Sequence, residues 1–402
     1  MTIIGGPRGG QPSARNGRGE VSIRRRGSAR VAMIGAGQVA RMTYQAAVDL
    51  DIDVVVLAGS TDDSAVVGGA PHRLGSSSCL ADIQAVAAGA DVVTFDHEVV
   101  PGAHLERLEQ LGYRLRPASP ALGLAQDKLK ARTILSESGF PVPAFARVSS
   151  PGDVARFAEA QRWPVIVKSA RGGYGGRGVH LIESLDQATA LFEPGTRENS
   201  FWLAEEHVDI AAELAILIAR SVSGYVAVYP AIQTVHEAGV RRHLLMPASL
   251  PAPVIDQAVR MAKSIADGID ATGVLAVEMF LDTRGQLLVD EIALRPHNSG
   301  HVTIEACETS QFHQHLRAVL DWPLGATTLR SPAATVNLIS GTDTCDPSVR
   351  LPRALAVPGA HIHLYGKAPR PGRKLGHVTA LGASTEQALE TAQTVAALLT
   401  ES

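Results

Sequence analysis

An apolar run that leads into a glycine turn and then a helical stretch constrains the fold of this chain more than any other feature. Residues 30–37 read Arg-Val-Ala-Met-Ile-Gly-Ala-Gly, and further apolar runs lie at 54–57 and 91–95 with helical stretches between them. Short buried strands that alternate with helices form a parallel sheet with helices on its faces. The sequence therefore predicts an N-terminal α/β domain over residues 30–125.

The rest of the chain has room for two more domains. Its 402 residues exceed the usual size of one domain, and we expect a central domain at 126–325 and a smaller one at 326–402. The elements expected there are a helix at 125–138, strands at 163–168, 201–205, 213–220 and 225–229, a helix at 251–268, strands at 274–281, 286–292, 333–339 and 361–365, and a helix at 384–400.

Composition excludes several classes of protein. The formal net charge of −3 gives no overall attraction to nucleic acid, and no apolar run approaches the roughly 18–20 residues that span a bilayer. The three cysteines are far apart without a CxxC spacing, so we expect a reducing cytoplasm and neither a disulfide framework nor a zinc site. Residues 1–29 are rich in glycine and arginine and predict a disordered basic leader, since an export signal needs an apolar segment.

The turn at residues 35–40 fits the pattern GxGxxA after a strand. In a dinucleotide site such glycines allow a phosphate to approach the N-terminus of the next helix. That site also needs an acidic residue at the end of the second strand, whereas Asp62 and Asp63 come after it. NAD binding, a plain strand–turn–helix connection and a substrate-facing turn all stay open.

A lysine at the end of an expected strand, Lys168, precedes a loop with five glycines between residues 172 and 178. The lysine offers a fixed positive charge, and the glycines let backbone N–H groups fold over phosphates. The chain has no GxxxxGK[ST] segment, so this is not a Walker loop. The alternative is a flexible surface loop, although so many glycines would be a costly way to build one.

Two glutamates, Glu278 and Glu291, lie in the expected strands at 274–281 and 286–292. If Arg284-Gly285 forms a two-residue turn, the two glutamates are directly opposite on one face. Like charges repel there, and a divalent cation such as Mg²⁺ would convert the pair into a binding site. The alternatives are two solvated glutamates on a sheet edge, or a four-residue loop that would break this register.

Two polar segments follow. Residues 295–301 combine an arginine, two histidines, an asparagine and a serine, and could hold a small anion and a phosphoryl oxygen. Residues 367–374 place four cations in eight residues, restrained by prolines and a glycine, which favours a phosphate pocket. The alternatives are an ordinary polar loop or a zinc site for the first segment, and a solvated charged face for the second.

Several of these segments together resemble the 5-(carboxyamino)imidazole ribonucleotide synthetase family of ATP-grasp ligases. The resemblance covers about residues 30–380 in family order. The HNSGH segment at 297–301 and the RPGRK segment at 370–374 are specific for this family among ATP-grasp ligases. The matching segments are residues 35–42, 172–178, 290–301, 310–312, 315–318 and 370–377.

The resemblance implies an α/β (α+β) ATP-grasp fold with a Rossmann-like N-terminal domain and a small C-terminal β-rich domain. The implied activity joins bicarbonate to the exocyclic amine of 5-aminoimidazole ribonucleotide in purine biosynthesis, with ATP cleaved to ADP and phosphate. In this family the γ-phosphoryl group of ATP is first transferred to bicarbonate. The product, carboxyphosphate, must be kept from water. The implied cofactors are ATP and Mg²⁺, with Mn²⁺ as the alternative cation, and the implied assembly is a homodimer.

The resemblance also carries roles to positions of this sequence. Catalysis is assigned to Arg295, His297 and Lys367. Nucleotide contacts are assigned to Lys128, Lys168, Gly173, Tyr174, Gly175, Gly176, Arg177, Gly178, Val179, Glu205, Glu206, His207, Val208, Glu213, His236, Asp290 and Glu291. Ribonucleotide contacts are assigned to Gln38, Glu98, Lys367, Arg373 and Lys374. Metal binding is assigned to Glu278 and Glu291.

The sequence departs from the family pattern at four positions. Gly175 replaces an aspartate, Asp290 an asparagine, Leu294 a proline and Val302 an aromatic residue. Gly175 therefore keeps a weakly active nucleotide-binding relative among the alternatives. Another ATP-grasp ligase, such as a formate-dependent purine transformylase or a biotin-type carboxylase, is disfavoured by the two specific segments. A nicotinamide dehydrogenase would depend on the glycine turn alone.

Overall fold

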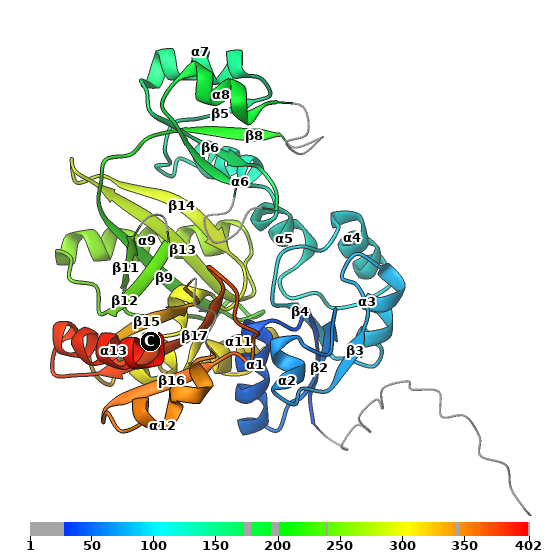
Figure 1. Cartoon of the computed structure of the whole chain (residues 1–402). Helices are drawn as coiled ribbons and strands as arrows, with labels where there is room; N and C mark the ends of the chain where they lie inside the picture. The colour runs from blue at the N-terminus through cyan, green and yellow to red at the C-terminus, as the bar shows by residue number, and fades with distance from the viewer. Residues whose placement is uncertain (1–27, 173–177, 194–200, 238–239, 342–345, 401–402) are drawn as a thin grey trace, which may run out of the picture.

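The computed structural model describes residues 28–172, 178–193, 201–237, 240–341 and 346–400, which form three β-sheets with helices packed against them (Figure 1). Residues 1–27 of the predicted leader lie outside the described residues, and so do the loop residues 173–177. Across the described ranges, no helix combines the length and the apolar character that crossing a membrane requires.

The N-terminal part consists of β1 (Arg30–Ile34), α1 (Gln38–Asp49), β2 (Asp53–Ala58), α2 (Ser64–Val67), β3 (His72–Leu74), α3 (Leu80–Ala87), β4 (Val92–Phe95), α4 (Gly102–Gln110) and α5 (Ser119–Ala125). Its strands form a sheet in the order β3-β2-β1-β4. They run parallel, as the alternation of strands and helices predicts. After Arg30, β1 is apolar because both faces are covered: Met33 packs with residues of α1, and Ile34 with residues of α3 and α4.

A small antiparallel sheet stands apart from the other two, at the top of Figure 1. Its elements are β5 (Phe145–Val148), α7 (Pro151–Gln161), β6 (Val165–Ser169), β7 (Val179–Ile182), α8 (Leu185–Leu191) and β8 (Trp202–Glu206), with strand order β5-β8-β6-β7. Both helices begin at a serine whose hydroxyl accepts a backbone N–H, Ser150 in α7 and Ser184 in α8. The helix α6 (Lys128–Glu137) connects the N-terminal part to this sheet.

The largest sheet is antiparallel and has the order β14-β13-β9-β11-β12-β15-β17-β16, with β10 paired to β9. The helix α9 packs on it through Ala258, Ala262 and Ile265, which recur at helical spacing and are fully buried. Its elements are β9 (Ile210–Arg220), β10 (Val226–Val228), β11 (Ile232–Glu237), β12 (Val240–Met246), α9 (Ala252–Gly268), β13 (Gly273–Asp282), β14 (Leu287–Ala293), α10 (Thr303–Ala306), α11 (Gln311–Val319), β15 (Ala333–Ile339), α12 (Leu351–Ala354), β16 (Ala360–Leu364), β17 (Lys374–Leu381) and α13 (Thr385–Thr400), with 3₁₀ turns at Asn298–Gly300 and Pro347–Arg350.

This sheet crosses the predicted boundary near residue 326. β12 pairs with β15, so Leu244 lies beside Thr335 and Met246 beside Ala333. The strands expected at 333–339 and 361–365 are present, but they extend the sheet of the central part of the chain rather than forming a sheet of their own. The mixed α/β fold class is confirmed, whereas the domain limits stay a prediction.

Candidate active site

The hairpin of β13 and β14 brings Glu278 and Glu291 directly opposite each other, as predicted, but not through the predicted turn. Near the turn Leu281 pairs with Leu287, and the backbone N–H of Asp282 donates to Gln286, so the two-residue Arg284-Gly285 turn is wrong. A register shift next to Glu278 inserts one extra residue, Asp290, into β14 and restores the glutamate pairing. The expected acidic pair therefore depends on a β-bulge.

The longer turn has a local cause in Asp282. Its buried carboxylate accepts hydrogen bonds from the backbone N–H groups of Arg284 at 2.9 Å and Gln286 at 2.7 Å. An aspartate that satisfies its own turn in this way favours a wider loop over a two-residue hairpin. The hydrogen bond from Gln286 is the largest of the effects that lower the pKa of Asp282.

Lys168 lies near the end of β6 and reaches across to the hairpin. Its Nζ is 2.7 Å from Oε2 of Glu205 and 3.0 Å from Oδ1 of Asp290. Arg132 on α6 contacts the same two carboxylates and the carbonyl of Val289. The predicted nucleotide contacts at these positions are therefore linked by a buried ion-pair cluster.

A small cleft opens beside this cluster. Lys128, the first residue of α6, donates from Nζ to Oε1 of Glu291 at 2.8 Å. Both predicted phosphate-binding lysines therefore line one cleft together with the acidic hairpin. The cleft is lined by Leu124, Ala125, Lys128, Ala131, Arg132, Leu135, Lys168, Asp290, Glu291 and Ile292.

The segment expected to bind adenine connects β8 to β9. Glu205 is buried and turned toward Lys168, whereas Glu206 accepts from the backbone N–H of Ala144 at 2.8 Å. His207 is exposed and Val208 half-buried. The remaining predicted positions are Glu213 and His236, whose Oε2 and Nδ1 atoms are 2.8 Å apart on the neighbouring strands β9 and β11, and Gly178 and Val179, which lead into β7.

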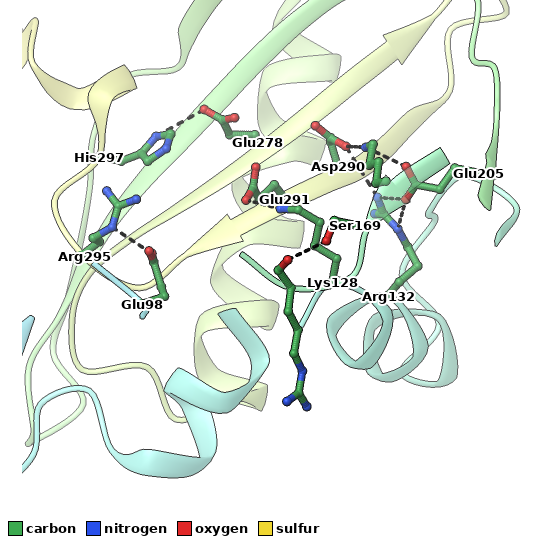
Figure 2. A network of polar contacts seen from close by, with 12 residues as sticks. Glu98, Lys128, Arg132, Ser169, Glu205, Glu278, Asp290, Glu291, Arg295 and His297 are labelled. Atoms are coloured by element: carbon green, nitrogen blue, oxygen red, sulfur yellow. Dashed lines mark hydrogen bonds and ion pairs between the residues drawn. The ribbon is translucent and has the colours of Figure 1, made fainter. Parts of the chain in front are cut away.

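Arg295 and His297 follow β14 and face the acidic hairpin on its other side (Figure 2). Arg295 Nε is 2.9 Å from Oε1 of Glu98, and His297 Nδ1 is 3.3 Å from Oε1 of Glu278. Gln311 braces the loop by accepting from the backbone N–H of His297 at 2.9 Å and donating to its carbonyl at 2.7 Å. The structure thus pairs the predicted catalytic residue Arg295 with the predicted substrate residue Glu98, and the predicted catalytic residue His297 with the predicted metal residue Glu278.

Two of the five predicted ribonucleotide contacts, Gln38 and Lys374, meet at Asn298. Its Oδ1 accepts from Gln38 at 3.3 Å and from Lys374 at 3.4 Å. Lys367 donates to Oε1 of Gln38. Burial, together with the charge of Arg373, lowers the pKa of Lys367 to about 8. Arg373 itself donates to the carbonyl of Ala368 within its own loop, at 3.0 Å.

The glycine turn before α1 is closed by Asp96. The backbone N–H of Gly37 donates to Oδ2 of Asp96 at 2.6 Å, and a Cβ on Gly35 would lie 1.8 Å from Oδ1. A carboxylate therefore occupies the position at the N-terminus of α1 where a dinucleotide phosphate would bind. This geometry disfavours the prediction of NAD binding. Burial raises the pKa of the Asp96 carboxyl group.

Comparison with known proteins agrees with this arrangement. Residues 28–126 match the ribonucleotide synthetase preATP-grasp domain, 133–312 the ATP-grasp domain and 333–391 the phosphoribosylaminoimidazole carboxylase C-terminal domain. N5-carboxyaminoimidazole ribonucleotide synthase of Mycobacterium tuberculosis is 44% identical over 371 residues, which cover 91% of this chain and 86% of that protein. The chain belongs to the N5-carboxyaminoimidazole ribonucleotide synthase family.

Solved structures of N5-carboxyaminoimidazole ribonucleotide synthases share the fold. An ADP complex superposes with a TM-score of 0.85 at 31% identity, covering 92% of this chain and 96% of that one. The Aspergillus clavatus enzyme in complex with ADP and 5-aminoimidazole ribonucleotide gives a TM-score of 0.84 at 30% identity, covering 92% and 98%. The expected ATP-grasp fold and the expected family are confirmed, and this chain is an ATP-dependent ligase of that family.

The sequence of this N5-carboxyaminoimidazole ribonucleotide synthase family member did not lead us to assign a site role to three polar residues, Arg132, Asp96 and Gln311. Arg132 is a helical residue without a motif around it, and only its burial reveals its role. Asp96 directly follows β4, and an acid at the carboxyl end of a parallel strand is a signal that could have identified it. Gln311 lies in a segment that carried the resemblance, although its contact with His297 spans 14 residues.

Proposed function

We propose that this chain uses ATP and bicarbonate to carboxylate the exocyclic amine of 5-aminoimidazole ribonucleotide. The products are 5-(carboxyamino)imidazole ribonucleotide, ADP and phosphate, formed through carboxyphosphate in purine biosynthesis. The observation that carries the proposal is the acidic hairpin, with two lysines on one side and Arg295 and His297 on the other. Such an arrangement suits a phosphoryl group that passes from a nucleotide to a small anion.

The nucleotide end of the site would be built from Lys128 and Lys168. Their charges neutralise phosphate oxygens, and the segment from Glu205 to Val208 would hold adenine. Glu278 and Glu291 fit a divalent cation because paired carboxylates supply the oxygen ligands that Mg²⁺ prefers. Within the described ranges no group of three or more acidic, histidine or cysteine side chains could hold a metal by itself, so phosphate oxygens would complete the coordination. The cation would supply charge neutralisation at the transferred phosphoryl group.

The acceptor end of the site would be built from Arg295 and His297. The Arg295 guanidinium can orient bicarbonate and hold the negative charge that develops on it. Glu98 fixes that guanidinium, and Gln311 fixes the loop that carries His297. Closing this region to water would protect carboxyphosphate until its carboxyl group, or the CO₂ released from it, meets the amine.

The ribonucleotide would bind between α1 and the loop before β17. Lys367, Arg373 and Lys374 would neutralise its 5′-phosphate, and Gln38 would orient the ring. When the C–N bond forms, the amine loses a proton and phosphate leaves, so a proton acceptor must be near the amine. A cytoplasmic location and a homodimer belong to the same proposal, and light scattering during size-exclusion chromatography would test the assembly.

Phosphate release from ATP in bicarbonate buffer tests the proposed function. We expect stimulation by 5-aminoimidazole ribonucleotide and a dependence on Mg²⁺ that Mn²⁺ can replace. Stimulation only by formate with glycinamide ribonucleotide would instead identify a transformylase. Tight ATP binding without turnover would identify a nucleotide-binding relative.

Gly175→Asp is expected to raise turnover. Position 175 lies outside the described residues, so the expectation depends on the family pattern, in which an aspartate there provides a carboxylate near the amine. The measurement is kcat for ribonucleotide-stimulated phosphate release. Gly175→Asn, which matches the size without the charge, should not reproduce the gain, and a loss or no change in Gly175→Asp would refute this role.

Ribonucleotide affinity is expected to fall as the pH rises through about 8, the lowered pKa of Lys367. A lysine whose pKa is lowered is charged below that value and neutral above it, so the phosphate loses one partner at alkaline pH. The expected increase in Kd approaches about tenfold per pH unit above the pKa. Calorimetric titrations measure it, and Lys367→Arg should remove the dependence. A Kd that stays constant through this range would exclude the charge of Lys367 as a contributor.

A further inference from the structure

The buried ion-pair cluster beside the cleft contains two cations and two carboxylates. Arg132 and Lys168 face Glu205 and Asp290, with side-chain exposures of 4%, 14%, 3% and 18%. Figure 2 shows Arg132, Glu205 and Asp290 of this cluster turned toward one another. The formal charges of the two cations and the two carboxylates cancel. The cluster therefore offers no net positive charge to the polyphosphate that the proposed function requires to bind beside it.

Each lysine of the cleft is already engaged by a neighbouring acid of β14. Lys168 is 3.0 Å from Asp290, and Lys128 is 2.8 Å from Glu291. Burial lowers the pKa of Lys168, but the carboxylates of Asp290 and Glu205 outweigh this effect and raise the pKa above its ordinary value. Lys168 therefore carries a full charge that its neighbours compensate, and a free polyphosphate must displace a buried carboxylate to reach it.

Asp290 has a different role from the other acidic residues of the site. Glu205 is held by Arg132 through two nitrogens and belongs to the segment expected to bind adenine. Glu278 and Glu291 form the pair that fits a divalent cation. Asp290 belongs to neither group, since the bulge turns it toward Lys168 and Arg132.

We propose that Asp290 makes nucleotide binding depend on a divalent cation by holding Lys168 in the nucleotide-free protein. A cation bound beside it offsets the Asp290 charge, and Lys168 becomes available to phosphate. Without that cation the carboxylate repels the polyanion and retains its lysine. Asp290 thereby selects metal-complexed nucleotide over free nucleotide. This inference rests on the proposed function.

Calorimetric titration of ADP, with excess Mg²⁺ and with EDTA, tests the inference on the full chain. Asp290→Asn should bind ADP in EDTA about tenfold more tightly than the wild type, because one negative charge is removed at ion-pair distance. With Mg²⁺ the two proteins should differ much less. Asp290→Glu keeps the charge and should retain the wild-type metal dependence, and thermal unfolding checks that each variant is folded.

Asp267→Asn is the matched control, because Asp267 forms an exposed ion pair with Arg220 at 3.1 Å. It should leave both affinities unchanged. The inference is overturned if Asp290→Asn binds metal-free ADP no more tightly than the wild type, or if Asp290→Glu behaves like Asp290→Asn. Failure of the wild type to bind ADP even with Mg²⁺ would overturn the proposed function, and the inference with it.

Discussion

Replacing Arg295 with alanine is expected to lower kcat for ribonucleotide-stimulated phosphate release by about 10³-fold. Burial lowers the pKa of Arg295, but the nearby Glu98 carboxylate outweighs it and raises the pKa, so the guanidinium keeps its charge. A fixed cation that faces a transferred phosphoryl group stabilises charge that exists only in the transition state. The loss should therefore affect kcat far more than the affinity for ATP.

Steady-state kinetics with both substrates varied would measure this effect. Arg284→Ala is a suitable control, because Arg284 is three-quarters exposed at the turn of the same hairpin and pairs with Asp282. Arg295→Lys should recover part of the rate, since it keeps the charge without the planar geometry. A drop in kcat of less than about tenfold in a folded Arg295→Ala protein would show that the guanidinium does not serve the reacting group.

Acidification is expected to destabilise the protein steeply between about pH 6.5 and 5. His301, His315 and His377 are fully buried, and burial lowers their pKa values, that of His315 to about 3. The unfolded chain takes up these protons near pH 6.5, so the stability is complete above that value and is lost as the pH falls. Each buried histidine lowers the free energy of unfolding by about 1.4 kcal/mol per pH unit below 6.5. The three histidines together would lower it by about 6 kcal/mol at pH 5.

Urea unfolding at several pH values measures this loss, and His315→Asn isolates one group. The Nδ1 atom of His315 accepts from the backbone N–H of Val274 at 3.1 Å, a role that an asparagine oxygen can retain. The variant should show a shallower fall of unfolding free energy, by about 1.4 kcal/mol per pH unit. The raised pKa of Asp96 acts in the opposite direction and offsets part of the total. Parallel curves for the two proteins would contradict the assignment.

The sequence predicts the local elements well where periodicity is strong. The parallel strands β1, β2 and β4 follow from apolar runs, and α9 follows from helical spacing, whereas the short parallel strand β3 (HRL) was not predicted. Strands β11 and β12 escape detection because both carry polar residues such as Thr234 and His243, and β17 because it begins within a basic segment. Such strands form because they pair with neighbouring strands in the folded protein, and a single sequence does not reveal which strands are neighbours.

The pairing of Glu278 with Glu291 is predicted from the sequence, but the reason given for it is wrong. Glu278 and Glu291 are paired, yet the turn assumed for them is absent and the bulge at Asp290 supplies the register. Bulges leave no reliable signal in a single sequence, because they depend on what the extra side chain contacts across the sheet. The contacts of Asp290 with Lys168 and Arg132 come from parts of the chain more than 100 residues away.

The unbroken strand pairing from β14 to β16 determines where this molecule can bend. Any rotation between the acidic hairpin and β17, which begins at Lys374, would break the main-chain hydrogen bonds between paired strands. Within the part of the chain that the structure describes, the small sheet with Lys168 has no strand paired to either of the other sheets. Any opening and closing of the proposed nucleotide site would therefore move the small sheet, while β14 and β17 keep a fixed mutual alignment.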